Sequence, residues 1–153
     1  MVSTGLIDVA YNALLVLLGL IGIPFWGILL LLKGRSPLPY LLGFRREELA
    51  CLEKKKVLWI QAVSVGEVSA VIPLLKAWRE QRPDWSILLT TTTATGQAYA
   101  RQWAAPHVDV IGYFPVDFVP VVVRVLNQVK PAAFVMVESE IWPNFLRLAK
   151  KRG

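Results

Sequence analysis

An uncharged, hydrophobic stretch near the N-terminus most strongly limits what this chain can fold into. No charged residue occurs between Val9 and Leu32, and Pro24 is the only proline in this stretch. At about 1.5 Å per residue, a helix over this stretch is long enough to cross the roughly 30 Å hydrocarbon layer of a membrane. The sequence therefore predicts a membrane-anchoring helix at residues 1–32.

Two other interpretations of this stretch are open. A cleaved signal peptide fits poorly, because no basic segment precedes the stretch and the stretch is too long. A buried core helix of a soluble domain is the second, and it is uncommon for a helix that is apolar on every side. The chain is 55% hydrophobic, above the usual share of about 45–50%, and the excess lies in this stretch.

Seven basic residues follow the stretch, whereas the only charged side chain before it is that of Asp8. Glycine and proline are also frequent in residues 33–56, which predicts a basic linker. Because positive residues stay on the cytoplasmic side, we expect the rest of the chain to face the cytoplasm. The same residues can hold it against anionic lipid headgroups. They are Lys33, Arg35, Arg45, Arg46, Lys54, Lys55 and Lys56.

The net charge and the single cysteine and histidine limit the kinds of partner and cofactor that we expect. A formal net charge of +6 favours an anionic membrane surface or a phosphorylated substrate. No basic stripe interleaved with aromatic residues occurs in the sequence, so no nucleic acid is expected. The only cysteine, Cys51, cannot form an internal disulfide, which fits a reducing compartment. With His107 as the only histidine, neither a metal nor a cofactor is expected.

From residue 57 onward, short apolar runs alternate with helical patterns. Strands are predicted at Val57–Val63, Ser86–Thr91, Val108–Phe114 and Ala132–Val137. Helices are predicted at Val68–Gln81, Gly96–Trp103, Phe118–Gln128 and Trp142–Lys151. This order predicts an α/β domain at residues 57–153, with an open parallel sheet covered by helices on both faces.

In such sheets ligands bind beyond the carboxyl ends of the strands. Four polar or glycine- and proline-bearing segments follow the predicted strands, and we expect a site there. These segments are Ser64–Glu67, Thr90–Gly96, Pro115–Asp117 and Glu138–Asn144. The pattern by itself predicts a membrane-tethered α/β domain with a site at four loops, and it names no reaction.

The first of these segments combines a tight turn with an acid. Gly66 allows a tight turn or the close approach of a ligand. The helix start that follows offers free backbone N–H groups, a natural site for an anion. Glu67 lies in the first helical turn as a candidate general base, although acids are also common there simply because they stabilise helices.

Two carboxylates, Glu138 and Glu140, follow the fourth strand, and a helix cap explains only one of them. Pro143 stands at a favoured early position of the last helix. The hydroxyl-rich run Thr90–Gly96 can bind phosphate or sugar hydroxyls, but threonine is equally a good strand residue.

Four segments together resemble the N-terminal domain of the 3-deoxy-D-manno-octulosonic acid (Kdo) transferases of lipopolysaccharide synthesis. They are WIQAVSVGEVSAVIPLLKAWREQRP (Trp59–Pro83), TTTTATG (Thr90–Gly96), FPVDF (Phe114–Phe118) and KPAAFVMVESEIWPN (Lys130–Asn144). Each motif alone is weak, but their order and spacing are specific. The resemblance runs from about Val57 to Gly153, and the preceding anchor and basic linker also suit the family.

The resemblance implies a fold, a reaction and a location. The family has the two-domain GT-B architecture, of which residues 57–153 would be the Rossmann-like, acceptor-side half. It transfers Kdo from CMP-Kdo, with inversion, to a lipid A precursor at the inner (plasma) membrane, on the cytoplasmic face. The C-terminal domain that binds the donor is absent from this sequence, so we expect this half to be inactive alone.

The resemblance also implies residue roles. Glu67 matches the family's catalytic base, and Glu138 matches a second active-site carboxylate. The expected substrate-binding residues are Ser64, Gly66, Thr93, Thr95, Gly96, Asp117, Glu140 and Asn144. Family members need no metal for catalysis.

The sequence departs from the family in places. Gln61 stands where members commonly carry histidine, and Gln cannot titrate. The family's stretch between anchor and first strand is only loosely matched by residues 43–46. Two alternatives therefore stay open: a non-catalytic, membrane-anchored module that binds a glycolipid, and a glycosyltransferase half with a different lipid acceptor.

Overall fold

The computed structural model describes residues 4–32, 44, 47–52, 56–138 and 140–152. The chain forms two compact units, residues 1–38 and 39–153. Six of the seven basic residues of the predicted linker, all except Lys56, lie outside the described residues.

The described part of the first unit forms the helix α1 (Thr4–Leu32), which continues through Pro24. It is 29 residues long, or about 44 Å at 1.5 Å per residue. Apolar side chains such as Leu6 and Leu20 are exposed along it. Among the described residues, α1 is the one helix long and apolar enough to cross a membrane, with a mean hydropathy of 1.9 over Gly5–Gly22.

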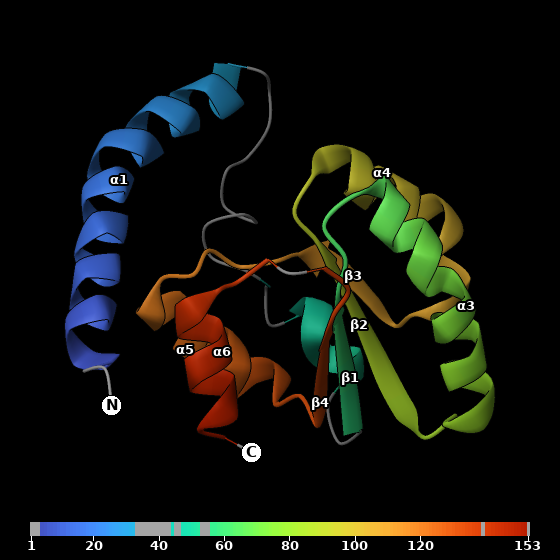
Figure 1. Ribbon diagram of the computed structural model, residues 1–153. Helices are drawn as coiled ribbons and strands as arrows, with labels where there is room; N and C mark the ends of the chain where they lie inside the picture. The colour runs from blue at the N-terminus through green and yellow to red at the C-terminus, as the bar shows by residue number, and fades with distance from the viewer. Residues whose placement is uncertain (1–3, 33–43, 45–46, 53–55, 139, 153) are drawn as a thin grey trace. The chain divides into compact units, whose positions relative to one another are not determined.

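The second unit is a four-stranded parallel sheet with helices, as the sequence predicts (Figure 1). Its strands are β1 (Lys56–Gln61), β2 (Trp85–Thr91), β3 (Val110–Tyr113) and β4 (Ala133–Met136), in the order β3-β2-β1-β4. Its helices are α3 (Val65–Gln81), α4 (Ala94–Trp103), α5 (Val119–Val129) and α6 (Pro143–Lys150). Two short 3-10 helices are η1 (Glu47–Leu52) and η2 (Ala105–His107).

Strand side chains alternate between two separate cores, because successive residues of a strand point to opposite faces of the sheet. Leu58 and Ile60 of β1 join a core with α3 and α4. Val57 and Trp59 join the other core, with α5 and α6. Figure 1 shows the two helix pairs on opposite faces of the sheet. Both faces of β1 are therefore buried from Val57 onward, which explains the unbroken apolar run Val57–Ile60.

Part of the segment expected to be a linker belongs to this unit. Phe44, Leu49 and Leu52 are buried in the same core as Trp59. Phe44 packs so closely on Gly112 of β3 that a Cβ there would collide with its ring. The Phe44 and Trp59 rings also meet edge to face, with centroids 6.2 Å apart. Residues on either side of the basic stretches therefore stabilise the sheet.

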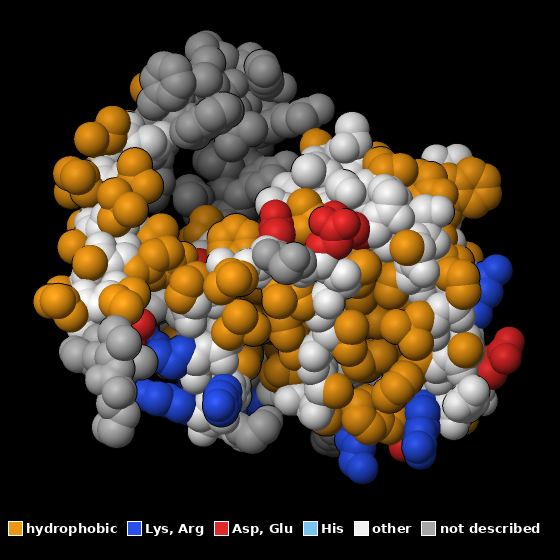
Figure 2. All heavy atoms as spheres, in the orientation of Figure 1, with side chains coloured by type: hydrophobic (Ala, Val, Ile, Leu, Met, Phe, Trp, Pro, Cys, Tyr) orange, Lys and Arg blue, Asp and Glu red, His pale blue; other side chains and the backbone are white. Residues whose placement is uncertain are grey.

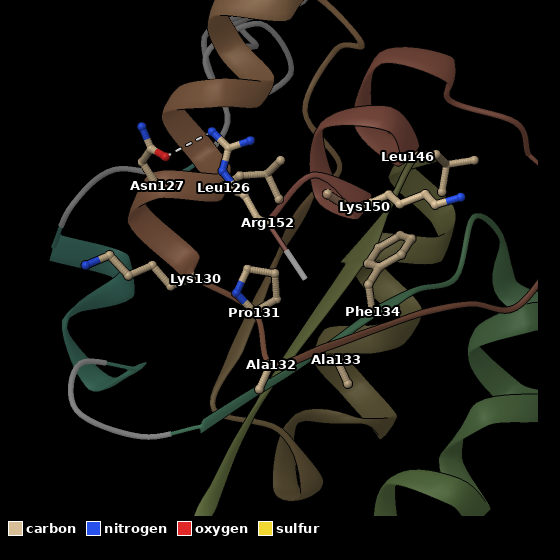
Figure 3. Close-up of a pocket in the computed structure, with 11 residues that line it drawn as sticks. Leu126, Asn127, Lys130, Pro131, Ala132, Ala133, Phe134, Leu146, Lys150 and Arg152 are labelled. Carbon is tan, nitrogen blue, oxygen red and sulfur yellow. Dashed lines mark hydrogen bonds between the residues drawn. The ribbon is translucent and has the colours of Figure 1, made fainter.

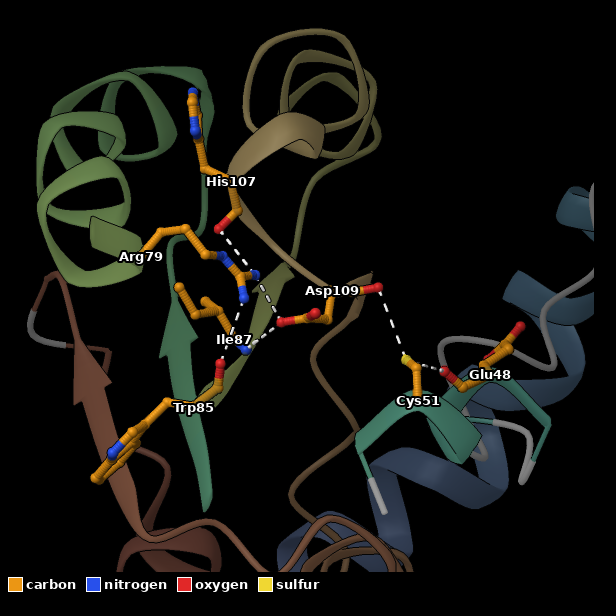
Figure 4. A network of polar contacts seen from close by, with 7 residues as sticks. All are labelled: Glu48, Cys51, Arg79, Trp85, Ile87, His107 and Asp109. Atoms are coloured by element: carbon orange, nitrogen blue, oxygen red, sulfur yellow. Dashed lines mark hydrogen bonds and ion pairs between the residues drawn. The ribbon is translucent and has the colours of Figure 1, made fainter. Parts of the chain in front are cut away.

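An arginine ties α3 to the beginning of β3 (Figure 4). Arg79 Nη2 lies 2.7 Å from Asp109 Oδ2, and its guanidinium also donates to the backbone carbonyls of Trp85 and His107. Asp109 Oδ2 accepts a second hydrogen bond from the Ile87 backbone N–H. His107 thus contributes its carbonyl to a structural network far from the carboxyl ends of the strands.

Candidate active site

The loops after β1 and β4 meet because these strands are neighbours in the sheet. Their parallel register pairs Gln61 with Met136, and the Val137 N–H donates to the Gln61 carbonyl, 3.0 Å away. The loops that carry Glu67 and Glu138 therefore begin side by side. Figure 2 shows acidic side chains gathered at this end of the unit, with Lys and Arg side chains along the opposite margin.

Glu67 is held by the turn that precedes its own helix. Its Oε2 accepts a hydrogen bond from the Val63 backbone N–H at 2.7 Å, and its Oε1 accepts one from the Ser64 hydroxyl at 3.1 Å. Only 9% of the residue is exposed. A carboxylate has about four lone-pair positions, so two acceptor positions remain. Glu67 is thus a fixed carboxylate that stabilises the start of α3.

The N-terminus of α3 is open to a ligand. Ser64 is the N-cap residue, but its side chain makes no capping hydrogen bond. Gly66 is exposed, and a Cβ placed there would meet nothing within 4 Å. The first N–H groups of a helix lack partners within the helix, and they carry a partial positive charge. A phosphate or carboxylate can therefore approach this backbone closely.

The threonine-rich turn after β2 is docked onto the turn after β1. The backbone N–H groups of Thr92 and Thr93 both reach the Val63 carbonyl. Thr93 Oγ1 accepts from the Gly96 N–H at 3.0 Å and donates to the Val63 carbonyl at 3.1 Å. A Cβ at Gly96 would lie 2.9 Å from both of those oxygens, so only glycine fits without a shift. Gly96 therefore serves the close approach of the two turns.

The hydroxyls of this turn differ in their availability. Thr90 and Thr91 are fully buried, and Thr93 caps α4. Thr95 is exposed and makes only a long contact of 3.4 Å with Thr93 Oγ1. Of the two predicted substrate-binding threonines, Thr95 is exposed and Thr93 is partly buried.

Glu140 lies within electrostatic reach of the other two carboxylates. Burial raises the pKa of Glu140, the nearby Trp142 side chain opposes the rise, and the negative charges of Glu67 and Glu138 add to it. Glu140 Oε2 and Trp142 Nε1 are both buried, and neither has a hydrogen-bond partner within the described ranges. The indole N–H thus approaches this carboxylate without completing a hydrogen bond. No role for Trp142 is predicted from the sequence, although Trp142 lies within the motif Lys130–Asn144.

Asp117 and Asn144, both predicted to bind substrate, are joined to each other. Asp117 Oδ2 accepts from the Asn144 N–H at 2.9 Å, and its Oδ1 accepts from the Phe145 N–H at 2.7 Å. Asn144 Nδ2 returns a hydrogen bond to the Asp117 carbonyl at 2.6 Å. Both side chains are almost completely buried. Asp117 therefore caps α6 from a distant loop, and contact with substrate stays a prediction for both residues.

Gln61 belongs to a buried polar chain. Its Oε1 accepts from the Thr90 hydroxyl at 2.5 Å, and its Nε2 donates to Thr92 Oγ1 at 3.0 Å. The Trp59 indole N–H donates to the same Thr90 oxygen at 2.8 Å. The Gln61 side-chain amide thus joins the end of β1 to the end of β2, and it does so as both a hydrogen-bond donor and an acceptor.

The structure thus brings Glu67, Glu138 and Glu140 together, and it places Ser64, Gly66 and the threonine turn beside them. Glu138 is exposed, and its role toward a substrate stays a prediction. No cluster of three or more metal-binding side chains was found among the described residues.

Fold and site together define an open α/β protein whose polar loops line the carboxyl edge of a parallel sheet, the usual place for a ligand in this class. Comparison with known proteins narrows the class. The family model described as 3-deoxy-D-manno-octulosonic-acid transferase (kdotransferase) matches residues 41–153. The chain belongs to this Kdo transferase family.

Individual proteins that resemble this chain carry the same description as the family. A 3-deoxy-D-manno-octulosonic acid transferase from Chlamydia muridarum is 34% identical over 97 residues, which are 63% of this chain and 23% of the relative. One from Haemophilus influenzae is 35% identical over 89 residues, 58% of this chain and 21% of the relative. A probable mitochondrial one from Arabidopsis thaliana is 35% identical over 94 residues, 61% of this chain and 21% of the relative.

The chain spans less than a quarter of the length of these three relatives. No solved structure matches it.

Proposed function

We propose that this chain supplies the acceptor-side part of an enzyme that transfers Kdo from CMP-Kdo to a lipid A precursor in lipopolysaccharide synthesis. In this proposal residues 57–153 form one half of a GT-B enzyme, and a donor-binding half completes it. The chain alone is then inactive, because a transferase must hold donor and acceptor in one site.

The meeting of three carboxylates with an open helix N-terminus, at neighbouring strand ends, carries this proposal. The motif around Glu67 and the motif around Glu138 are far apart in the sequence, yet they follow adjacent parallel strands. Glu140 responds electrostatically to both of them. A sugar hydroxyl and an anionic group can therefore be bound at one place.

In this mechanism Glu67 is the general base. The acceptor hydroxyl oxygen attacks the anomeric carbon of Kdo, its proton moves to Glu67, and the bond from the anomeric carbon to CMP breaks with inversion. The hydrogen bonds from the Val63 N–H and the Ser64 hydroxyl fix the direction of the carboxylate. The exposed Glu138 accepts hydrogen bonds from the acceptor.

In this proposal the helix α1 anchors the enzyme to a membrane. Its length and apolar composition suit a membrane-spanning anchor. The basic residues within 33–56 favour a position of the following unit on the cytoplasmic side of the inner membrane. A lipid-linked acceptor is confined to the same surface, so an anchor raises the local concentration of enzyme near its substrate.

Replacement of the proposed base tests this function. The full chain, mixed with the separately expressed remainder of the Haemophilus influenzae relative, is incubated with CMP-Kdo and a lipid A precursor. We expect Glu67→Gln to lower transfer by about 100-fold or more, because a positioned base contributes roughly 10²–10⁴-fold. Kdo incorporation is measured by mass spectrometry of the lipid product.

The matched control is Glu80→Gln, the same change at an exposed position near the end of the same helix. It should retain full transfer. Circular dichroism should show that both variants fold. Near-normal transfer by Glu67→Gln would remove Glu67 from the mechanism.

A second candidate function is a non-catalytic, membrane-anchored module that binds a glycolipid. The observation that favours it is that both oxygens of Glu67 already accept local hydrogen bonds, which suffices to explain an acid at this position. The same assay separates the two functions. Binding of the lipid A precursor without transfer, even when the donor-side polypeptide is present, supports the module.

A further inference from the structure

Val63 connects the proposed base to the turn after β2. Its N–H donates to Glu67 Oε2 at 2.7 Å, the shorter of the two hydrogen bonds that hold this carboxylate. Its carbonyl accepts from the backbone N–H groups of Thr92 at 3.3 Å and Thr93 at 3.2 Å. Val63 itself lies between the end of β1 and the start of α3, outside both elements. These hydrogen bonds therefore set the direction of its N–H.

The Thr93 hydroxyl has no free hydrogen for a substrate. A threonine hydroxyl donates one hydrogen and accepts at two lone-pair positions. Its hydrogen goes to the Val63 carbonyl at 3.1 Å, and the Gly96 N–H occupies one acceptor position at 3.0 Å. The Thr95 hydroxyl approaches the other position at 3.4 Å. Every hydrogen-bonding position of Thr93 Oγ1 is therefore engaged, although the sequence predicts a substrate-binding role for Thr93.

Two further residues hold the threonine turn in place. Gln61 Nε2 donates to Thr92 Oγ1 at 3.0 Å, which ties the turn to the end of β1. Gly96 brings the turn close, because a Cβ there would lie 2.9 Å from both Thr93 Oγ1 and the Val63 carbonyl oxygen. The contact between Thr93 and Val63 is thus supported on both sides.

The position of this contact matters for general-base chemistry. A base must come within about 2.6–3.2 Å of the hydroxyl whose proton it takes. A misplacement of about 1 Å can lower a rate about 100-fold. The N–H and the carbonyl of Val63 belong to one residue, so a shift of the carbonyl also moves the N–H that holds Glu67. The turn after β2 can therefore control the base without touching it.

Thr93 does not line the cavity beside the beginning of β4 (Figure 3). That cavity has a volume of about 600 Å³, and its walls include Leu126, Phe134 and Leu146. It adjoins the amino end of β4, whereas the turn that carries Thr93 follows the carboxyl end of β2. Parallel strands begin and end at opposite edges of a sheet, so a ligand in this cavity would not reach Thr93.

We propose that Thr93 is a positioning residue for the general base: its hydroxyl holds the Val63 carbonyl, and the Val63 N–H in turn directs the Glu67 carboxylate. The inference rests on the proposed function, because Glu67 is the base only in that mechanism. Thr93 itself does not bind the substrate. Thr95, whose side chain is exposed, stays the predicted substrate ligand of this turn.

The first test needs no transferase activity. The full chain, labelled with ¹⁵N and held in detergent, is studied by hydrogen exchange at the Val63 amide. Thr93→Val removes the hydroxyl but keeps the branched shape of the side chain. We expect the Val63 amide to exchange about tenfold faster in this variant, because its hydrogen bond to Glu67 is weakened. Thr93→Ser keeps the hydroxyl and should exchange like the natural chain.

The second test is steady-state transfer. The full chain is combined with the separately expressed remainder of the Haemophilus influenzae relative, CMP-Kdo and a lipid A precursor. Thr93→Val should lower kcat about tenfold or more, with KM for the precursor unchanged within about twofold. Thr93→Ser should restore kcat. The matched control is Ser69→Ala, which removes an exposed hydroxyl from α3 and should change neither kcat nor exchange at Val63.

Two results would overturn the proposal. One is a higher KM at unchanged kcat for Thr93→Val, which would make Thr93 a substrate ligand. The other is an unchanged exchange rate at the Val63 amide. Circular dichroism checks folding, and Gly96→Ala replaces Thr93→Val if the latter does not fold. Its added methyl group separates the same two turns, so it should also lower kcat and speed exchange at Val63.

The two measurements separate this inference from the proposed function. Faster Val63 exchange in Thr93→Val, in a system where the natural chain transfers no Kdo, contradicts the function and supports the connection from Thr93 to Glu67. Equal transfer by Thr93→Val and the natural chain contradicts the positioning role and supports the function.

Discussion

At the scale of single residues, atoms of the site serve folding and proposed chemistry together. Glu67 closes the turn before α3 and is also the proposed base. Two glycines of the site differ in what surrounds them. Gly96 allows two turns to touch, whereas Gly66 faces open space. The first is therefore a requirement of packing, and the second leaves room for a ligand to approach the backbone.

The carboxylate of Glu140 gives a prediction about stability and pH. Its pKa is raised, chiefly by burial, so folding favours the protonated form. That contribution is fully present below the ordinary pKa of 4.5 and is lost as the pH rises through the folded-state pKa. Glu140→Gln should therefore unfold at higher urea concentration than the natural chain at neutral pH. The difference should shrink as the pH is lowered towards 4.5.

Urea midpoints measured by tryptophan fluorescence across this pH range check the prediction. Glu80→Gln, at an exposed position, should show no such pH-dependent gain. A natural chain that is more stable than Glu140→Gln at neutral pH would contradict it.

At the scale of elements, several boundaries depend on side chains from elsewhere. The helix predicted from Val68 begins at Val65, because Ser64 and Glu67 organise its first turn. The strand predicted at Val108–Phe114 is shorter, Val110–Tyr113. The start of α6 is held by Asp117, which lies in the loop before α5. Periodicity finds the elements, but contacts between loops decide where they end.

The contribution of the Asp117 cap on α6 to the free energy of unfolding can be measured. Asp117→Ala leaves two buried backbone N–H groups without their charged acceptor, and we expect a loss of about 2–4 kcal/mol in the free energy of unfolding. Urea unfolding followed by circular dichroism gives this value. Asp84→Ala, at an exposed turn position, is the control and should change stability by less than about 0.5 kcal/mol. A similarly small loss for Asp117→Ala would show that α6 does not depend on this cap.

At the scale of the whole molecule, the membrane-suited helix and the α/β unit are separate compact units. We expect a chain that lacks residues 1–32 to fold but to leave the membrane fraction, because the apolar helix is its main attachment. Sedimentation of membranes, before and after a high-salt wash, measures this. Release only by salt would assign the attachment to basic residues. Complete sedimentation after the wash would contradict an anchor in residues 1–32.

The sequence by itself determined the apolar helix, the alternation of strands and helices, the parallel sheet and the family, because each depends on local composition, periodicity or motif order. Only the tertiary structure decided that β1 and β4 are neighbours, and so that Glu67, Glu138 and Glu140 share one edge. It also decided that Asp117 caps a distant helix and that β4 has an open side. Strand order and contacts between loops join residues far apart in the chain, and no local pattern records which of them meet.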